Sequence, residues 1–171
     1  MPFTIRDFEA ADFDALWRID QDCFPPGISY SRTELKFYVH RRGSFTLVAV
    51  ETALAAMSAP DSGRGNQNSL TIPLANPVAG FIVAEASRGS GHIITIDVIA
   101  AARRAGAGSQ LLLGAEERLR AGQCRSIELE TAVDNVSALA FYKRHGYSVV
   151  KTFPRYYSNG LDALVLEKEI V

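Results

Sequence analysis

Apolar residues recur along the chain at two spacings, and each spacing predicts one type of element. Alternation at every second residue, or a short run rich in Val and Ile, predicts a strand, whereas apolar residues three or four apart predict a helix. Strands are predicted at 3–8, 45–51, 78–87, 92–99, 126–132, 147–153 and 162–170. Helices are predicted at 11–24, 31–41, 108–121 and 137–146.

Local signals support several of these boundaries. Ser31 and Glu34 have the spacing of a capping box, which predicts a helix that begins immediately after Ser31. Gly122 and Gly146 follow the last apolar positions of two predicted helices, as is typical of helix ends. The letters RGSG separate the strands at 78–87 and 92–99, which favours a hairpin.

The order of the elements predicts the fold class. One strand, two helices, three strands, a helix, a strand, a helix and two strands predict an α/β (α+β) protein, with a mixed sheet covered by helices. With 171 residues, of which 47% are hydrophobic, the chain can bury one substantial core. We therefore expect a single domain over residues 1–171.

The segment 52–77 is the least regular part of the sequence. Its centre is rich in Gly, Ser, Asn and Asp and has no hydrophobic period. A loop of this length within one domain is either a surface excursion or a functional lid. Because residues 58–70 offer no apolar stripe, we expect them to pack at the surface at most.

Charge and composition exclude several classes of partner. The formal charge is −1, from 18 basic and 19 acidic residues, so no overall field attracts nucleic acid or an anionic membrane. No apolar run is long enough for a membrane span, and the first residues do not form a signal peptide. We expect a cytoplasmic monomer or homodimer with reduced Cys23 and Cys124. The three histidines are scattered and predict neither a metal site nor a catalytic triad.

A candidate anion site lies where the strand at 92–99 runs into the next helix. The letters ARRAGAGS place two arginines and two glycines at the helix start, where backbone amides lack partners and the helix dipole is positive. Gly106 and Gly108 would let the chain turn and a phosphate approach closely. The alternative is an ordinary turn. There is no GK[ST] of a P-loop and no third glycine at the dinucleotide-fold spacing.

Together with a later segment, this loop resembles the GNAT family of N-acetyltransferases. The family has a Q/R-x-x-G-x-G/A loop, here 103–108, followed by an Asn and an A-x-x-(F/L)-Y-x-x-x-G-(F/Y) helix, here within 130–147. Bacterial ribosomal-protein alanine N-acetyltransferases are the most similar group, through Glu130, Asn135, Tyr142 and the letters RYYSNGLDALVL. The letters IAAA before the loop and the segment 52–77 depart from the family pattern.

This resemblance implies a fold, a cofactor and a set of site residues. The fold is a mostly antiparallel sheet of about six to seven strands with about four helices on both faces. The cofactor is acetyl-CoA, with no metal, and its pantetheine arm would bind where two strands part. The residues implied in cofactor binding are Ile96, Val98, Arg103, Arg104, Ala105, Gly106, Ala107, Gly108, Ser109, Asn135 and Tyr142.

Acetyl transfer to an amine requires a base for the amine and an acid for the departing thiolate. The resemblance implies Glu130 as the base and Tyr142 as the acid, with Phe24 and Tyr157 at the acceptor wall. Glu128 and Glu130 lie two apart on one strand, so their side chains share a face and each would raise the pKa of the other. The alternatives are a solvated sheet face for the glutamates, a core role for Tyr142 and a helix cap for Asn135.

The acceptor is a primary amine, and a protein N-terminus is the first candidate. An α-amine has a pKa of about 8, against about 10.4 for lysine, so a larger fraction is neutral at pH 7. A small-molecule amine is the alternative acceptor, because fold analogy does not choose between them. A non-catalytic acyl-CoA-binding or scaffold module is the alternative of another class.

Overall fold

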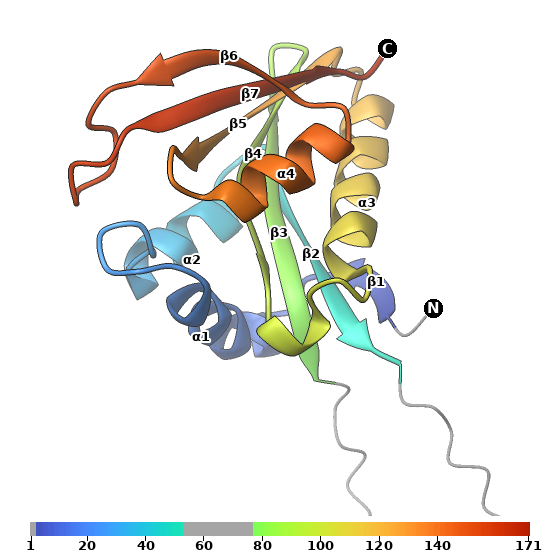
Figure 1. Ribbon diagram of the computed structural model, residues 1–171. Coiled ribbons are helices and arrows are strands. Elements are labelled where there is room, and N and C mark those ends of the chain that lie inside the picture. The colour runs from blue at the N-terminus through green and yellow to red at the C-terminus, as the bar shows by residue number, and fades with distance from the viewer. Residues whose placement is uncertain (1–2, 53–76) are drawn as a thin grey trace, which may run out of the picture.

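The computed structural model describes residues 3–52 and 77–171, which form a seven-stranded sheet with helices on both faces (Figure 1). The strand order is β1-β2-β3-β4-β5-β7-β6, and all neighbours are antiparallel except β4 and β5. The strands are β1 (Phe3–Asp7), β2 (Ser44–Glu51), β3 (Val78–Ser87), β4 (Ser90–Val98), β5 (Ser126–Ala132), β6 (Ser148–Phe153) and β7 (Ala163–Glu169). The predicted mixed, mostly antiparallel sheet is confirmed.

The helices divide the core into two layers. They are α1 (Phe13–Cys23), α2 (Arg32–His40), α3 (Ala107–Ala121) and α4 (Val136–Arg144). One hydrophobic cluster joins α1 and α2 to one face of the sheet through Leu16, Leu35 and Phe81. A second cluster joins α3 and α4 to the other face through Leu111, Ile127 and Tyr142. No helix in the described ranges is long and apolar enough to cross a membrane.

Most predicted boundaries are confirmed to within one or two residues. Ser31 and Glu34 form the reciprocal capping box, and the turn between β3 and β4 holds Arg88 and Gly89 with positive φ. The helix predicted at 11–24 is instead a 3₁₀ turn, Ala10–Asp12, followed by α1. The prediction for 52–77 lies outside the described residues, apart from Thr52 and Pro77 at its two ends.

The feature that shapes the site is the short pairing between β4 and β5. Only Ser90–Ile93 pair with Ser126–Leu129. Beyond these residues β4 continues to pair with β3 and β5 with β7, so the two strands part. In Figure 1, β5, β7 and β6 accordingly cross the upper part of the molecule in a different direction from β2, β3 and β4.

A β-bulge in β4 determines which side chains face α1 and α2. Val83 lies opposite Thr95 and Ala84 opposite Ile93, so Ile94 is the extra residue. His92 lies opposite Glu85, and Asp97 lies opposite Phe81, which belongs to the cluster of α1 and α2. Because side chains of facing residues share a face, His92 and Asp97 both lie on the side of α1 and α2.

A buried ion pair anchors α3 to the far end of the sheet. Glu116 of α3 is 2% exposed, and its carboxylate accepts hydrogen bonds from Lys168 Nζ of β7 (2.7 Å) and from the Tyr147 hydroxyl (3.1 Å). A buried carboxylate left without its cation would be strongly destabilising, because it has lost its water. This contact therefore fixes α3, and with it the loop at its N-terminus, relative to β7.

We expect Lys168→Met to lower the free energy of unfolding by about 3 kcal/mol, because it leaves Glu116 charged and unpaired. Tyr147→Phe removes one neutral donor and should cost about 1 kcal/mol. Urea unfolding measures both, and the double variant Glu116→Gln, Lys168→Met should regain much of the loss. A Lys168→Met protein as stable as the wild type would contradict this assignment.

Candidate active site

The parting of β4 and β5 leaves part of the β4 backbone without a strand partner. Ile99 N donates to Ala79 O on β3 (2.9 Å). Successive residues of a strand direct their backbone groups to opposite edges, so Val98 and Ile96 direct their N–H and C=O groups away from β3. Val98 O accepts from Arg103 Nε (2.9 Å) and from Cys23 Sγ (3.5 Å). An extended ligand that lies along this edge could bond to these groups as an added strand would.

The loop that follows β4 ends at the N-terminus of α3. Gly106 is the N-cap of α3 with φ of +95°, and no side chain caps this end. Ala107, Gly108 and Ser109 form the first turn, whose amides lack helical acceptors. Gly108 is a helical residue, in agreement with the helix predicted at 108–121, and it is Gly106 rather than Gly108 that makes the turn into the helix. The arrangement presents free N–H groups and a positive dipole end to an anion.

The two arginines of the loop differ in their surroundings. Arg103 bends back to Val98 O, and its Nη2 donates to Cys23 Sγ (3.5 Å), so it joins the ends of β4 and α1. Arg104 and Ala105 are exposed beside Gly106, and Arg104 has φ of +64°. Arg104 is therefore the arginine that remains available to a phosphate group.

A histidine that the sequence analysis left without a role joins this loop to α4. His145 Nδ1 contacts Phe141 O (2.8 Å), and because a carbonyl only accepts, Nδ1 donates. His145 Nε2 lies 3.0 Å from Ser109 Oγ, in the first turn of α3. The Phe141 ring packs beside Gly108. The N-terminus of α3 and the C-terminus of α4 are therefore held together.

Tyr142 of α4 is buried, at 6% exposure, with its ring against those of Phe141 and Tyr147. Burial raises its pKa, and the charge of Asp97 adds to this, so the phenol keeps its proton at neutral pH. Asn135 is the N-cap of α4 and accepts from Ala138 N (3.1 Å). The capping role considered for Asn135 is therefore present.

Glu130 of β5 contacts His92 of β4 at the point where the strands part. Glu130 Oε2 lies 2.7 Å from His92 Nε2, and Glu130 Oε1 has no hydrogen bond to the described residues. The hydrogen bond to Glu130 raises the pKa of His92, against the opposing effect of burial. Sequence reasoning missed His92, because the two residues are 38 positions apart and meet only through the register of β4 and β5.

The expected pairing of Glu128 with Glu130 is not the contact that surrounds Glu130. Glu128 is exposed, and it forms no ion pair with a described residue. The imidazole of His92, rather than a second carboxylate, is the nearest titratable group to Glu130.

Two buried carboxylates lie beneath the open end of β4, and sequence reasoning missed both. Asp97 Oδ1 accepts from Thr95 Oγ1 (2.9 Å), and Asp20 Oδ2 accepts from Tyr30 N (2.8 Å). The other oxygen of each is buried with no partner in the described part of the chain. Burial raises the pKa of Asp20 to about 6, and burial and Asp20 raise the pKa of Asp97.

The two predicted acceptor-wall residues lie in loops that meet. Phe24 is half-buried at the end of α1, where the loop to α2 begins, and Tyr157 lies between β6 and β7. Ser158 Oγ donates to Gly27 O (3.0 Å), which links the two loops. Burial and the charges of Tyr156 and Glu130 raise the pKa of Tyr157, so this loop borders Glu130.

Comparison with known proteins identifies the family. The profile described as Acetyltransferase (GNAT) family matches residues 13–147, which include β4, the glycine loop, α3, β5 and α4. The chain belongs to the GNAT acetyltransferase family. The resemblance expected from the loop at 103–108 and the helix around Tyr142 is thereby confirmed.

Similar proteins support this membership. An N-alpha-acetyltransferase of Sulfurisphaera tokodaii is 32% identical over 167 residues, which cover 96% of this chain and 91% of that protein. An uncharacterized N-acetyltransferase of Methanocaldococcus jannaschii is 39% identical over 93 residues, 54% of this chain and only 60% of that protein. The match thus spans less than two thirds of the latter relative.

Solved structures share the GNAT fold. Ard1 from Thermoplasma volcanium superimposes with a TM-score of 0.79 at 24% identity, covering 100% of this chain and 99% of that one. The ribosomal-protein-S18-alanine N-acetyltransferase from Escherichia coli gives 0.74 at 19% identity, covering 98% and 94%. Each supports the same sheet and helix arrangement.

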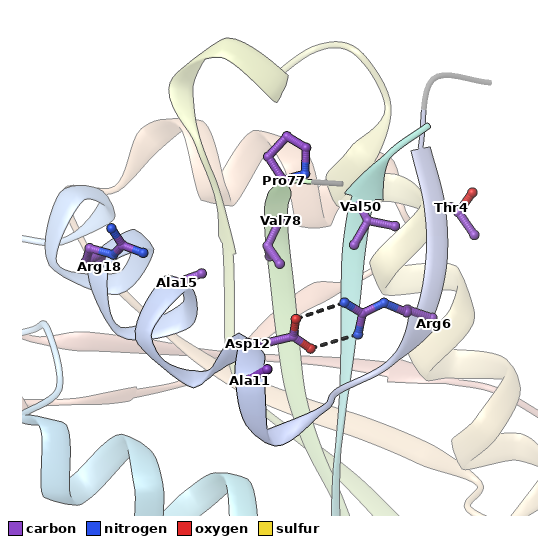
Figure 2. A pocket seen from close by; sticks show the side chains of 9 residues that line it. All are labelled: Thr4, Arg6, Ala11, Asp12, Ala15, Arg18, Val50, Pro77 and Val78. Carbon is purple, nitrogen blue, oxygen red and sulfur yellow. Dashed lines mark hydrogen bonds and ion pairs between the residues drawn. The ribbon is translucent and has the colours of Figure 1, made fainter. Parts of the chain in front are cut away.

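One pocket of this GNAT chain lies away from the parted strands. It has a volume of about 540 Å³ and is bordered by β1, β2, β3 and α1. Within its lining, the Arg6 guanidinium donates two hydrogen bonds to the Asp12 carboxylate (Figure 2). None of its lining residues is a predicted site residue.

In the described ranges, no three His, Cys, Asp or Glu side chains are grouped as metal ligands.

We expect two glycine variants of the loop to behave differently. Gly106→Ala forces a left-handed φ on alanine and should cost about 1–2 kcal/mol of stability. In Gly108→Ala the new Cβ would meet the Phe141 ring at an ordinary 3.5 Å, so stability should be kept or slightly raised. Because the family pattern admits Gly or Ala at this position, coenzyme A affinity should also be kept, whereas Gly106→Ala disturbs the turn that presents the free amides and should weaken coenzyme A binding.

Thermal unfolding and calorimetric titration with coenzyme A measure the two effects separately. Unchanged coenzyme A affinity in a folded Gly106→Ala protein would contradict the placement of the phosphate groups at this helix end.

Proposed function

We propose that this protein transfers an acetyl group from acetyl-CoA to a primary amine, with a protein N-terminus as the acceptor. The observation that carries the proposal is the contact of Glu130 with His92 beside the opening between β4 and β5. The Tyr142 phenol, which keeps its proton, and the unpaired backbone of β4 support the proposal as the other groups that acetyl transfer needs, in a member of an acetyltransferase family.

The cofactor would bind along the edge that β4 exposes. The pyrophosphate lies over residues 104–109, where the amides of the first turn of α3 and Arg104 meet an anion. The pantetheine arm bonds to the backbone of Ile96 and Val98, as an added strand would. Acetyl-CoA supplies the activated acetyl group when bound, and Asn135 and His145 fix α4 beside it.

The reaction would proceed by direct attack of the amine on the thioester carbonyl carbon. A C–N bond forms, and the attacking nitrogen becomes acidic, so a carboxylate can accept its proton. Glu130, held by His92, is that base, directly or through a water molecule. As the C–S bond breaks, Tyr142 gives its proton to the thiolate, and burial ensures that the phenol carries that proton beforehand.

Two observations support a protein N-terminus as the acceptor. The Sulfurisphaera relative, which aligns over nearly the whole chain, bears the name N-alpha-acetyltransferase. An α-amine, with a pKa of about 8, is neutral far more often at pH 7 than a lysine with a pKa of about 10.4.

We expect acetyl-CoA turnover to be fastest with short peptides that carry a free N-terminus. Lysine peptides with a blocked N-terminus and small amines such as polyamines serve as the comparison acceptors. Free thiol release, followed with a thiol reagent, measures all three. Faster turnover with a small amine than with every peptide would replace the N-terminal acceptor by a small-molecule one.

Tyr142→Phe should lower kcat by about 100-fold or more and leave the affinity for coenzyme A nearly unchanged, because only the acidic hydroxyl is lost. The ring still packs against Phe141 and Tyr147. Steady-state kinetics and calorimetry measure the two quantities. A stable, fully active Tyr142→Phe protein would remove the general-acid role and leave cofactor binding intact.

Glu130→Gln should depress turnover most at low pH, because the amine is then mostly protonated and depends on help with its proton. As pH rises, the neutral fraction of the amine grows, and the ratio of variant to wild-type rate should rise with it. Glu128→Gln, which removes the same charge from an exposed site on the same strand, is the control. Equal effects of both variants would argue against Glu130 as the base.

A further inference from the structure

A row of four ionisable side chains crosses the face of the sheet that α1 and α2 cover. Nη1 of Arg41, which follows α2, lies 3.3 Å from Glu85 Oε2. Glu85 Oε1, on β3, lies 3.7 Å from His92 Nδ1, on β4. His92 Nε2 then lies 2.7 Å from Glu130 Oε2, on β5. The row therefore runs from the end of α2 to the proposed base.

Strand register fixes this row. Glu85 and His92 are direct partners in the antiparallel pairing of β3 and β4, so their side chains share a face. His92 is the partner of Glu128 in the parallel pairing of β4 and β5, and Glu130 lies two residues further along the same face. The Glu85 side chain is 15% exposed and that of Glu130 19%, so both interactions are partly shielded from water.

The two ring nitrogens of His92 face two different carboxylates. Carboxylates only accept, so a neutral ring supplies a hydrogen to one of them and presents a lone pair to the other. An imidazolium supplies a hydrogen on both sides. The charged groups that face His92 in the described residues are Glu85 on β3 and Glu130 on β5, with Glu128 next along β5 and Arg41 beyond Glu85.

We propose that Glu85 is a positioning residue for acetyl transfer, which holds His92 as an imidazolium that donates its Nε2 hydrogen to Glu130. Arg41 fixes Glu85 by taking Oε2, so that Oε1 is left toward His92. The imidazolium engages only Oε2 of Glu130, so Oε1 remains to accept a proton. The inference rests on the proposed function in that Glu130 is the base.

The charges of Glu130 and Glu85 both favour the protonated ring, and the pKa of His92 is raised. A raised pKa means that the charge persists to higher pH and is lost as pH rises through the folded-state value. Removal of the Glu85 charge should therefore lower the pH at which His92 loses its proton. In the interval between the two midpoints, only the wild type retains the imidazolium.

The direct test titrates the His92 ring in the cofactor-free protein by long-range proton–nitrogen NMR, so it does not depend on any acceptor. We expect Glu85→Gln to move the His92 midpoint downward by about half a pH unit or more. Glu128→Gln is the matched control, since it removes an equal charge from the register partner of His92 and should shift the midpoint less. A shift no larger than that of the control would overturn the proposal.

The second arm measures acetyl transfer. Glu85→Gln should lower kcat/KM for the acceptor, with the KM for acetyl-CoA unchanged, and the ratio of variant to wild-type rates should fall as pH rises between the two midpoints. Glu85→Asp should restore part of the rate. A ratio that does not vary with pH overturns the positioning role. If the wild type acetylates no amine, the proposed function fails, and the NMR titration still decides whether Glu85 controls His92.

Discussion

The separation of β4 from β5 is the constraint on which the rest of the site depends. A parallel pair that stays joined would use the backbone groups of Ile96 and Val98 within the sheet, and no edge would remain in the interior of the molecule. Pairing ends at Ile93 and Leu129, and the two halves of the sheet then take different directions. Beyond that point β4 stays paired with β3 and β5 with β7, so the facing edges of β4 and β5 have no strand partner.

The two helices beside this edge are fixed at opposite ends. Glu116 joins α3 to β7 through Lys168, and Ser109 joins the first turn of α3 to His145 at the end of α4. Displacement of α3 along its axis would disturb both contacts. The helix that offers its amides to an anion and the helix that carries Tyr142 are thus held as one unit. On the opposite face, strand register brings Glu85, His92 and Glu130 together, and Arg41, after α2, contacts Glu85.

The sequence predicted the elements well because their signals are local. The capping box at Ser31, the left-handed Gly106 and the alternation within β5 each depend on a few neighbouring residues. His92, Glu85 and Asp97 were missed because their roles depend on strand register and on one bulge, which no short window of sequence encodes. His145 was missed because its partner, Ser109, lies 36 residues away. The roles of Glu130 and Tyr142 came from family resemblance, and the structure adds the partner that Glu130 contacts.

The extra residue in β4 also limits how this chain can change in length. Ile94 separates two segments of β4 whose side chains would otherwise alternate without interruption. Deletion of this one residue would move Thr95 and Asp97 to the face of α3 and bring Ile96 and Val98 to the face of α1, with a buried carboxylate placed among Leu and Ala side chains. A substitution at Ile94 alters one contact, whereas its deletion exchanges the two faces of the strand. We therefore expect a change of residue type at Ile94 to be tolerated far better than a change in the length of this stretch.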